Sequence, residues 1–235
     1  MFPAVHGIAS QGNKGGAPNP VEFGVLGVSS AGHDPVGSDH TVPLPEGEGG
    51  LLVVIAKGAG GTQLRWSAPG GWTTAASEGD GSTNWPVVVF ARMVDGTEPD
   101  ILTFSTMNSL GTAPTVAGSA LVAYRVAGAH GAVEAAFSSV ANPPALTPSW
   151  GAAEILWIAA FTSRLSNGTF TAPPANYGGL TPARSPTISA TNTYAQMATA
   201  HRLHTAATED PGTFAFTGTT NGLFTATIAV RAAAP

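Results

Sequence analysis

Short apolar runs separated by Gly, Pro and polar turns recur along the chain from residue 21 onward. The strongest are residues 51–56 (LLVVIA), apolar on both faces as a buried central strand is, and residues 86–92 (PVVVFAR). Further strands are predicted at residues 22–29, 40–45, 63–66, 101–104 and 120–126. No apolar stripe with a helical period extends over three turns, and the best helical candidate, residues 131–137, is short. The pattern predicts an all-β chain with little or no helix.

The second half of the chain repeats the first at an offset of about 105 residues. Four markers keep their order: residues 51–56 correspond to 155–160, residues 69–72 to 174–177, residues 98–104 to 209–216, and residues 121–125 to 227–231. A Pro-rich link over residues 142–150 separates the halves. The pseudo-repeats are therefore expected at about 21–140 and 141–235.

Two architectures fit this repeat. Each half forms its own small sandwich, or the two halves interleave in one sandwich. Each half offers only about four or five strands, and a sheet with an apolar face needs a second layer to cover it. We therefore predict one two-sheet β-sandwich of jelly-roll or Greek-key type over residues 21–235, in which the Pro-rich link crosses between the halves.

The composition supports this fold and narrows the classes of partner. The 235 residues include 30 Gly and 19 Pro, which suit strands joined by many turns, and only 10% are charged. A surface so poor in charge is typical of a protein that partners partly cover. The net charge is −5 and no Lys/Arg cluster occurs, so neither nucleic acid nor a membrane is expected as a partner. The N-terminus lacks the pattern of a secretion signal, so we expect no export by such a signal.

Residues 1–20 are rich in Gly, Pro and Asn and show no strand or helix period. Two interpretations stay open: a frayed terminus, or an arm that orders only against a neighbouring subunit. In the second case, the polar side chains of the arm are candidate partner-binding residues, namely Gln11, Asn13, Lys14 and Asn19.

No set of residues has the spacing of a catalytic or cofactor site, so we predict that the protein is not an enzyme. The chain has no cysteine, no Gly-x-Ser-x-Gly nucleophile motif and no phosphate-binding glycine loop ahead of a helix. His201 and His204 would point to opposite faces of a strand, and residues 33–40 hold two His and two Asp without a closed ligand set. We therefore predict no metal and no cofactor. A glycosidase pair of carboxylates stays open, because folding alone sets its spacing.

Aromatic side chains offer one candidate ligand surface. Several aromatic residues could form a platform for stacking on sugar rings, namely Trp66, Trp72, Trp85, Trp150, Trp157, Tyr177 and Tyr194. Trp72, Trp85 and Tyr177 are the leading candidates among them. The alternative is that these rings plug the ends of the sandwich core. The repeat favours this alternative, because Trp72 and Tyr177 occupy equivalent positions in the two halves.

Several segments together resemble a family of tailed-bacteriophage virion proteins. They are residues 49–54 (GGLLVV), 66–73 (WSAPGGWT), 95–99 (DGTEP), 142–151 (NPPALTPSWG) and 209–231. The resemblance covers residues 21–235 and rests on turn and core motifs, so it implies a fold more directly than a task. It implies a non-enzymatic β-sandwich on the capsid exterior or in the tail, with no catalytic residues.

This resemblance leads us to expect a capsid decoration or cement protein that stabilises the head of a virion assembled in the host cytoplasm. The expected partners are the major capsid protein or other virion subunits, together with further copies of the chain in a homo-oligomer or symmetric array. Two alternatives remain: a tail or fibre protein that contacts glycan on the host surface, and a free carbohydrate-binding module.

Overall fold

The computed structural model describes most of the chain after residue 21. The described residues are 22–34, 38–60, 63–79, 83, 85–108, 118–164, 168–186, 194–218 and 220–234. Within these ranges every regular element is a β-strand, as the sequence predicts, and every strand pairing is antiparallel. No described segment is a helix of the length and hydropathy needed to cross a membrane.

The described residues of the first half form eight strands. They are β1 (Gly24–His33), β2 (Asp39–Pro43), β3 (Leu51–Ala59), β4 (Leu64–Ser67), β5 (Thr73–Glu78), β6 (Val87–Met93), β7 (Ile101–Asn108) and β8 (Gly118–Ala127). Five of them form a sheet in the order β1-β8-β3-β6-β5, and the other three form a smaller sheet in the order β2-β7-β4. This is the strand order of a jelly roll, in which the first and last strands pair in one sheet and the second and seventh in the other. Among the described strands the departure from this order is that β5 joins the edge of the larger sheet.

The second half contains the remaining strands. They are β9 (Ala129–Ser138), β10 (Ala153–Arg164), β11 (Thr169–Ala172), β12 (Gly178–Arg184), β13 (Ala195–Ala206), β14 (Ala215–Thr217) and β15 (Asn221–Ala232). Their five-stranded sheet has the order β9-β15-β10-β13-β12, with β11 and β14 paired beside it. An isolated bridge between Leu146 and Glu209 stands where β2 pairs with β7 in the first half. Each half is therefore a jelly roll, and the repeat predicted from the sequence is confirmed.

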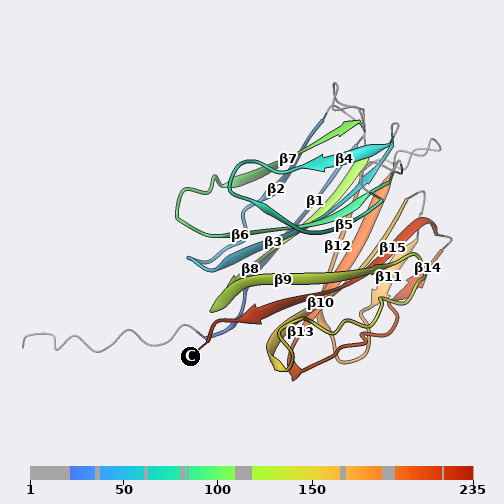
Figure 1. Cartoon of the computed structure of the whole chain (residues 1–235). Helices are drawn as coiled ribbons and strands as arrows, with labels where there is room; N and C mark the ends of the chain where they lie inside the picture. Colours follow the sequence, from blue (N-terminus) through green and yellow to red (C-terminus); the bar gives the residue numbers. More distant parts are fainter. Residues whose placement is uncertain are drawn as a thin grey trace, which may run out of the picture.

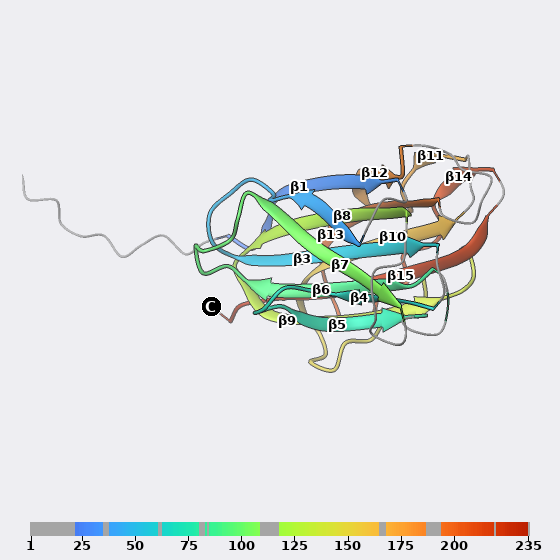
Figure 2. The ribbon, with the colours of Figure 1, turned by 90° about the horizontal axis from the view of Figure 1, so that it is seen from above.

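The two five-stranded sheets pack face to face around a shared apolar core (Figures 1 and 2). Val53 and Val122 from the first half meet Leu156 and Ile158 from the second half there, all fully buried. Each smaller sheet covers the outer face of the larger sheet in its own half, with a separate core between them. The molecule thus combines the two architectures that fit the sequence, because each half has its own core and the halves share a third.

The boundary between the halves lies at Gly128. Sequence analysis places it near residue 140, but β9 hydrogen-bonds to β15 and belongs to the second sheet. Gly128 adopts φ +60°, a left-handed conformation that turns the chain sharply between β8 and β9. A single glycine leaves a much weaker signal than the Pro-rich link, which instead joins β9 to β10 within the second jelly roll.

The predicted correspondence of residues 51–56 with 155–160 identifies the right strands but is displaced by one residue. Leu51 faces the shared core, whereas Ile155 faces the outer core and Leu156 takes the inward place. A one-residue shift exchanges the two faces of a strand. Both central strands are apolar on both faces, so their sequences contain no alternation that sets the register.

Candidate functional site

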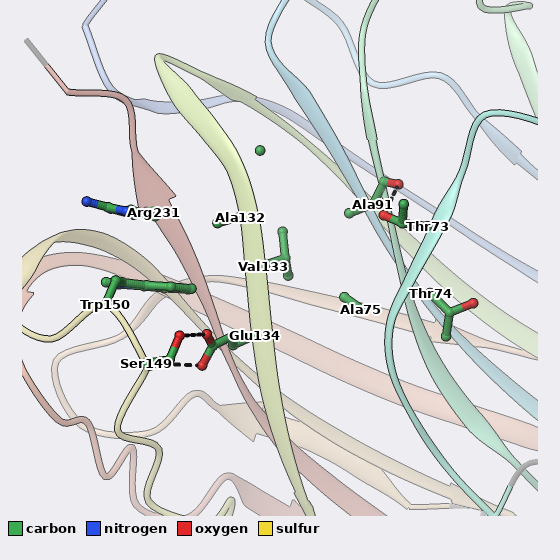
Figure 3. Close-up of a pocket in the computed structure, with 11 residues that line it drawn as sticks. Thr73, Thr74, Ala75, Ala91, Ala132, Val133, Glu134, Ser149, Trp150 and Arg231 are labelled. Atoms are coloured by element: carbon green, nitrogen blue, oxygen red, sulfur yellow. Dashed lines mark hydrogen bonds between the residues drawn. The ribbon is translucent and has the colours of Figure 1, made fainter.

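An open groove of about 540 Å³ runs along one edge of the sandwich, between the free edges of β5 and β9 (Figure 3). Both are edge strands of their sheets, so each leaves one side of its backbone without a strand partner. Thr73, Thr74 and Ala75 line the β5 side, and residues 131–134 line the β9 side. Ser149, Trp150 and Arg231 extend the β9 side. The groove therefore combines side chains from both halves of the chain.

A clamped turn positions Trp150 in this groove. The backbone N–H of Gly151 donates to the carbonyl of Pro148 at 3.1 Å, and Gly151 adopts φ +74°. The carboxylate of Glu134 on β9 accepts hydrogen bonds from the Ser149 backbone N–H, at 3.0 Å, and from the Ser149 hydroxyl (Figure 3). Trp150 is partly buried, and its indole nitrogen is itself buried, without a hydrogen-bond partner among the described residues. The turn thus holds part of an aromatic ring at the groove.

The repeat shows that the guanidinium of Arg231 is not used to hold the fold. Its counterpart in the first half is Arg125, because Arg125 pairs with Leu52 of β3 and Arg231 pairs with Ile155 of β10 on equivalent outer faces. Arg125 is buried and donates to the carbonyl of Gly47. Arg231 is partly exposed, and no described residue accepts a hydrogen bond from it or forms an ion pair with it.

The opposite edge of the sandwich is closed. There β1 lies against β12, and Gly32 contacts the backbone so tightly that an added Cβ would be 1.7 Å from the carbonyl oxygen of Arg184. The two edges correspond in the repeat, since β1 is equivalent to β9 and β12 to β5. The two edges of the sandwich therefore differ, although they are built from equivalent strands: the edge with β1 and β12 is closed, and the edge with β5 and β9 holds the groove.

The three residues predicted to stack on sugar lie in three separate apolar clusters. Trp72 is partly buried and packs edge-to-face on Phe104, with ring centres 5.1 Å apart. Tyr177 is buried in the outer core of the second half, and Trp85 packs against the shared core beneath the guanidinium of Arg164, 3.7 Å from the ring centre. The structure does not bring these three rings together. The predicted arm residues, including Gln11, Asn13, Lys14 and Asn19, lie outside the described residues.

A buried arginine–glutamate pair recurs in both halves. The Arg92 guanidinium lies 3.4 Å from the Glu98 carboxylate, and Arg202 pairs with Glu209; each glutamate side chain is only 2% exposed. In the second half the Tyr177 hydroxyl donates to Glu209 at 3.1 Å. Burial and the negative charge of Glu209 raise the pKa of Tyr177 well above its usual value. Because an arginine–glutamate pair occurs in both halves of the repeat, we interpret it as a structural feature of the jelly rolls and not as a ligand site.

His40 is fully buried in the first half. One ring nitrogen lies 3.0 Å from the Thr106 hydroxyl and the other 2.9 Å from the Ser119 hydroxyl. Burial disfavours the charged ring and the neighbouring His33 adds repulsion, which together lower the pKa of His40 to about 4. Among the described residues no group of three or more His, Asp or Glu side chains is placed to hold a metal ion.

His201 and His204 lie on opposite faces of β13, as their spacing implies. His201 packs edge-to-face on Tyr124 in the shared core, with ring centres 5.6 Å apart, and His204 is exposed. Burial lowers the pKa of His201. The two imidazoles are not arranged to share a ligand.

Both ends of the described chain lie at one end of the sandwich (Figures 1 and 2), and exposed apolar side chains are concentrated there. This terminal end holds the starts of β1, β3, β9 and β10 and the ends of β6, β8, β13 and β15. Of the large apolar side chains exposed within the described ranges, four are found there: Leu26, Met93, Ile101 and Leu203. Val140, which follows the far end of β9, is the exception.

Comparison of the chain with protein-family models, with curated proteins and with solved structures finds no match. The exposed apolar end and the unpaired Arg231 are not predicted from the sequence. Trp150 is one of the aromatic residues that the sequence offers for sugar stacking, whereas Arg231 is distinguished only by its contrast with the buried Arg125.

Proposed function

We propose that the chain is a non-enzymatic structural subunit of a tailed-bacteriophage virion, and that it decorates the capsid by docking its terminal end on shell subunits. The observation that carries the proposal is the set of exposed apolar side chains at that end. Ile101 is 56% exposed and Leu203 is 48% exposed. Burying such side chains against a partner yields roughly 25 cal/mol per Å² of apolar surface.

The fold supports a mechanical role. Four stacked layers with three apolar cores give a rigid body, and joining two jelly rolls in one chain removes the entropic cost of bringing them together. A cement protein needs this rigidity, because it must resist movement of the subunits that it bridges. The sequence resemblance to virion proteins of tailed phages points the same way.

Quantitative mass spectrometry of purified particles tests the virion assignment. A decoration protein is expected in simple ratio to the major shell protein, with hundreds of copies in each head. A few to a few tens of copies would instead favour the tail or fibre alternative. Absence of the chain from purified particles would rule out the virion proposal altogether.

A pair of charge substitutions tests the docking end. Ile101→Asp with Leu203→Asp places two charges on the terminal end, and we expect attachment to particles that lack the protein to fall at least tenfold. Val140→Asp is the matched control, because Val140 is equally exposed but lies elsewhere. Equal attachment of the two variants would show that the terminal end is not the docking surface.

A further inference from the structure

We propose that the groove between β5 and β9 binds a neutral hexose oligosaccharide, in contact with Trp150, Glu134 and Arg231. This inference goes beyond the proposed virion role and is independent of it. It rests on the unpaired guanidinium of Arg231, on the partly exposed ring of Trp150, and on the difference between the two halves of the repeat.

The comparison of the halves separates structural residues from free ones. In the first half, Arg125 is buried and its guanidinium donates a hydrogen bond to the carbonyl of Gly47. In the second half, the equivalent Arg231 is partly exposed and has no partner among the described residues. The residue of β1 equivalent to Glu134 is Ser29, since they pair with Ala123 and Ala229, which correspond in the repeat. Ser29 donates to the Pro43 carbonyl, whereas Glu134 presents a carboxylate at the groove. The second half therefore has a carboxylate and an unpaired guanidinium among the residues that line the groove.

These groups have the chemistry that sugar hydroxyls require. A carboxylate accepts hydrogen bonds from a pair of neighbouring hydroxyls, and a guanidinium donates to their oxygens. Glu134 is already oriented by two donors from Ser149 and retains unused lone pairs, so it does not have to reorganise on binding.

The ring of Trp150 provides the apolar contact. The C–H face of a pyranose packs on an aromatic ring, and tryptophan offers a large ring at low entropic cost. The turn formed by residues 148–151 and the clamp from Glu134 keep this ring in place (Figure 3). On the other side of β9, Thr73 and Ala75 of β5 line the groove from the first half, and the Thr74 side chain points away from Trp150 (Figure 3).

Charge and size favour a neutral, short ligand. Glu134 and Arg231 carry opposite charges on the same side of the groove, so the site has no net attraction for an anion or a cation. The groove volume of about 540 Å³ lies within the range of small-ligand sites, about 300–1,000 Å³. It is open rather than enclosed, so an oligosaccharide chain can continue beyond the bound sugar.

The test is binding of the full-length protein to an array of neutral hexose and N-acetylhexosamine oligosaccharides, followed by calorimetry on the best probe. Trp150→Ala and Arg231→Gln are each expected to weaken binding at least tenfold. Arg65→Gln is the matched control, because Arg65 is exposed on the smaller sheet of the first half and should leave binding unchanged. Thermal unfolding of each variant shows that the loss is not caused by misfolding.

Three results would overturn the inference: no neutral oligosaccharide binds, both groove variants bind like the unaltered protein, or glucuronate oligosaccharides bind more tightly than neutral ones. The experiment is distinct from that on the virion role. Ile101→Asp with Leu203→Asp should reduce particle attachment and leave saccharide binding intact, and Arg231→Gln should do the reverse.

Discussion

The ammonium group of Lys57 in β3 donates a hydrogen bond to the backbone carbonyl of Gly222 in β15, at 3.1 Å, across the junction of the two jelly rolls. It also donates to the carbonyl of Trp85 at 2.6 Å and lies 4.9 Å from the centre of the Phe224 ring. The side chain is fully buried, and no described carboxylate pairs with it. Two backbone carbonyls and one ring face therefore hold this buried amino group at the junction of the halves.

Lys57 should make stability rise with pH above neutrality. Burial, with repulsion from Arg164, lowers the pKa of Lys57 well below its ordinary value of 10.5. Between the lowered pKa and about 10.5 the unfolded chain binds more protons than the folded one, so the free energy of unfolding increases with pH in that window. Urea unfolding at pH 7 to 9.5 measures this slope, which we expect to disappear in Lys57→Met. An unchanged slope in that variant would assign the effect to other groups.

His40 should make stability fall on acidification. Its folded-state pKa of about 4 lies below the unfolded value of 6.5, so the folded chain binds fewer protons between these limits. Stability is complete above about pH 6.5 and is lost as the pH falls toward 4, by about 3 kcal/mol at most. We expect His40→Gln to flatten the dependence of urea unfolding on pH over this range. The exposed His204→Gln is the control and should keep the slope of the unaltered protein.

Gly32→Ala should destabilise the closed edge of the sandwich. The new Cβ would lie 1.7 Å from the Arg184 carbonyl oxygen and 2.9 Å from the Ser185 nitrogen, so the backbone of β1 or β12 must move. We expect a loss of at least about 2 kcal/mol in the free energy of unfolding. Gly178→Ala is the control, because Gly178 lies in β12 at the same closed edge and no atom lies within 4 Å of its added Cβ. This variant should have nearly the same free energy of unfolding as the unaltered protein. Equal stability of the two variants would contradict the close approach.

Glu209→Ala should destabilise the second jelly roll. The substitution leaves the Arg202 guanidinium without its partner and the buried Tyr177 hydroxyl without an acceptor. Because Arg202 is partly exposed, water recovers some of the loss, and we expect about 2 kcal/mol. Denaturant unfolding of this variant and of Glu154→Ala, an exposed control, measures the difference. A double-mutant cycle with Tyr177→Phe should show coupling between the two side chains.

Much of the fold is predictable because local patterns carry it. The apolar run at residues 51–56 and the many Gly and Pro residues predict buried strands and turns, which the structure confirms. The repeat is visible for the same reason, since both jelly rolls need a central apolar strand and an aromatic at the same turn, Trp72 or Tyr177. The candidate groove is not predictable in this way, because Thr74, Glu134 and Arg231 come from strands far apart in the chain.

The sequence by itself determined the all-β class, the repeat and the absence of recognisable catalytic motifs, because strand periodicity, turn residues and motif spacing are local properties. Only the tertiary structure decided which residues of β3 and β10 face the shared core and where the boundary between the halves lies, at Gly128. It also decided the difference between the unpaired Arg231 and the buried, hydrogen-bonded Arg125. The physical reason is the same in each case. These features depend on which sheet faces which, and a strand that is apolar on both faces does not encode that choice locally.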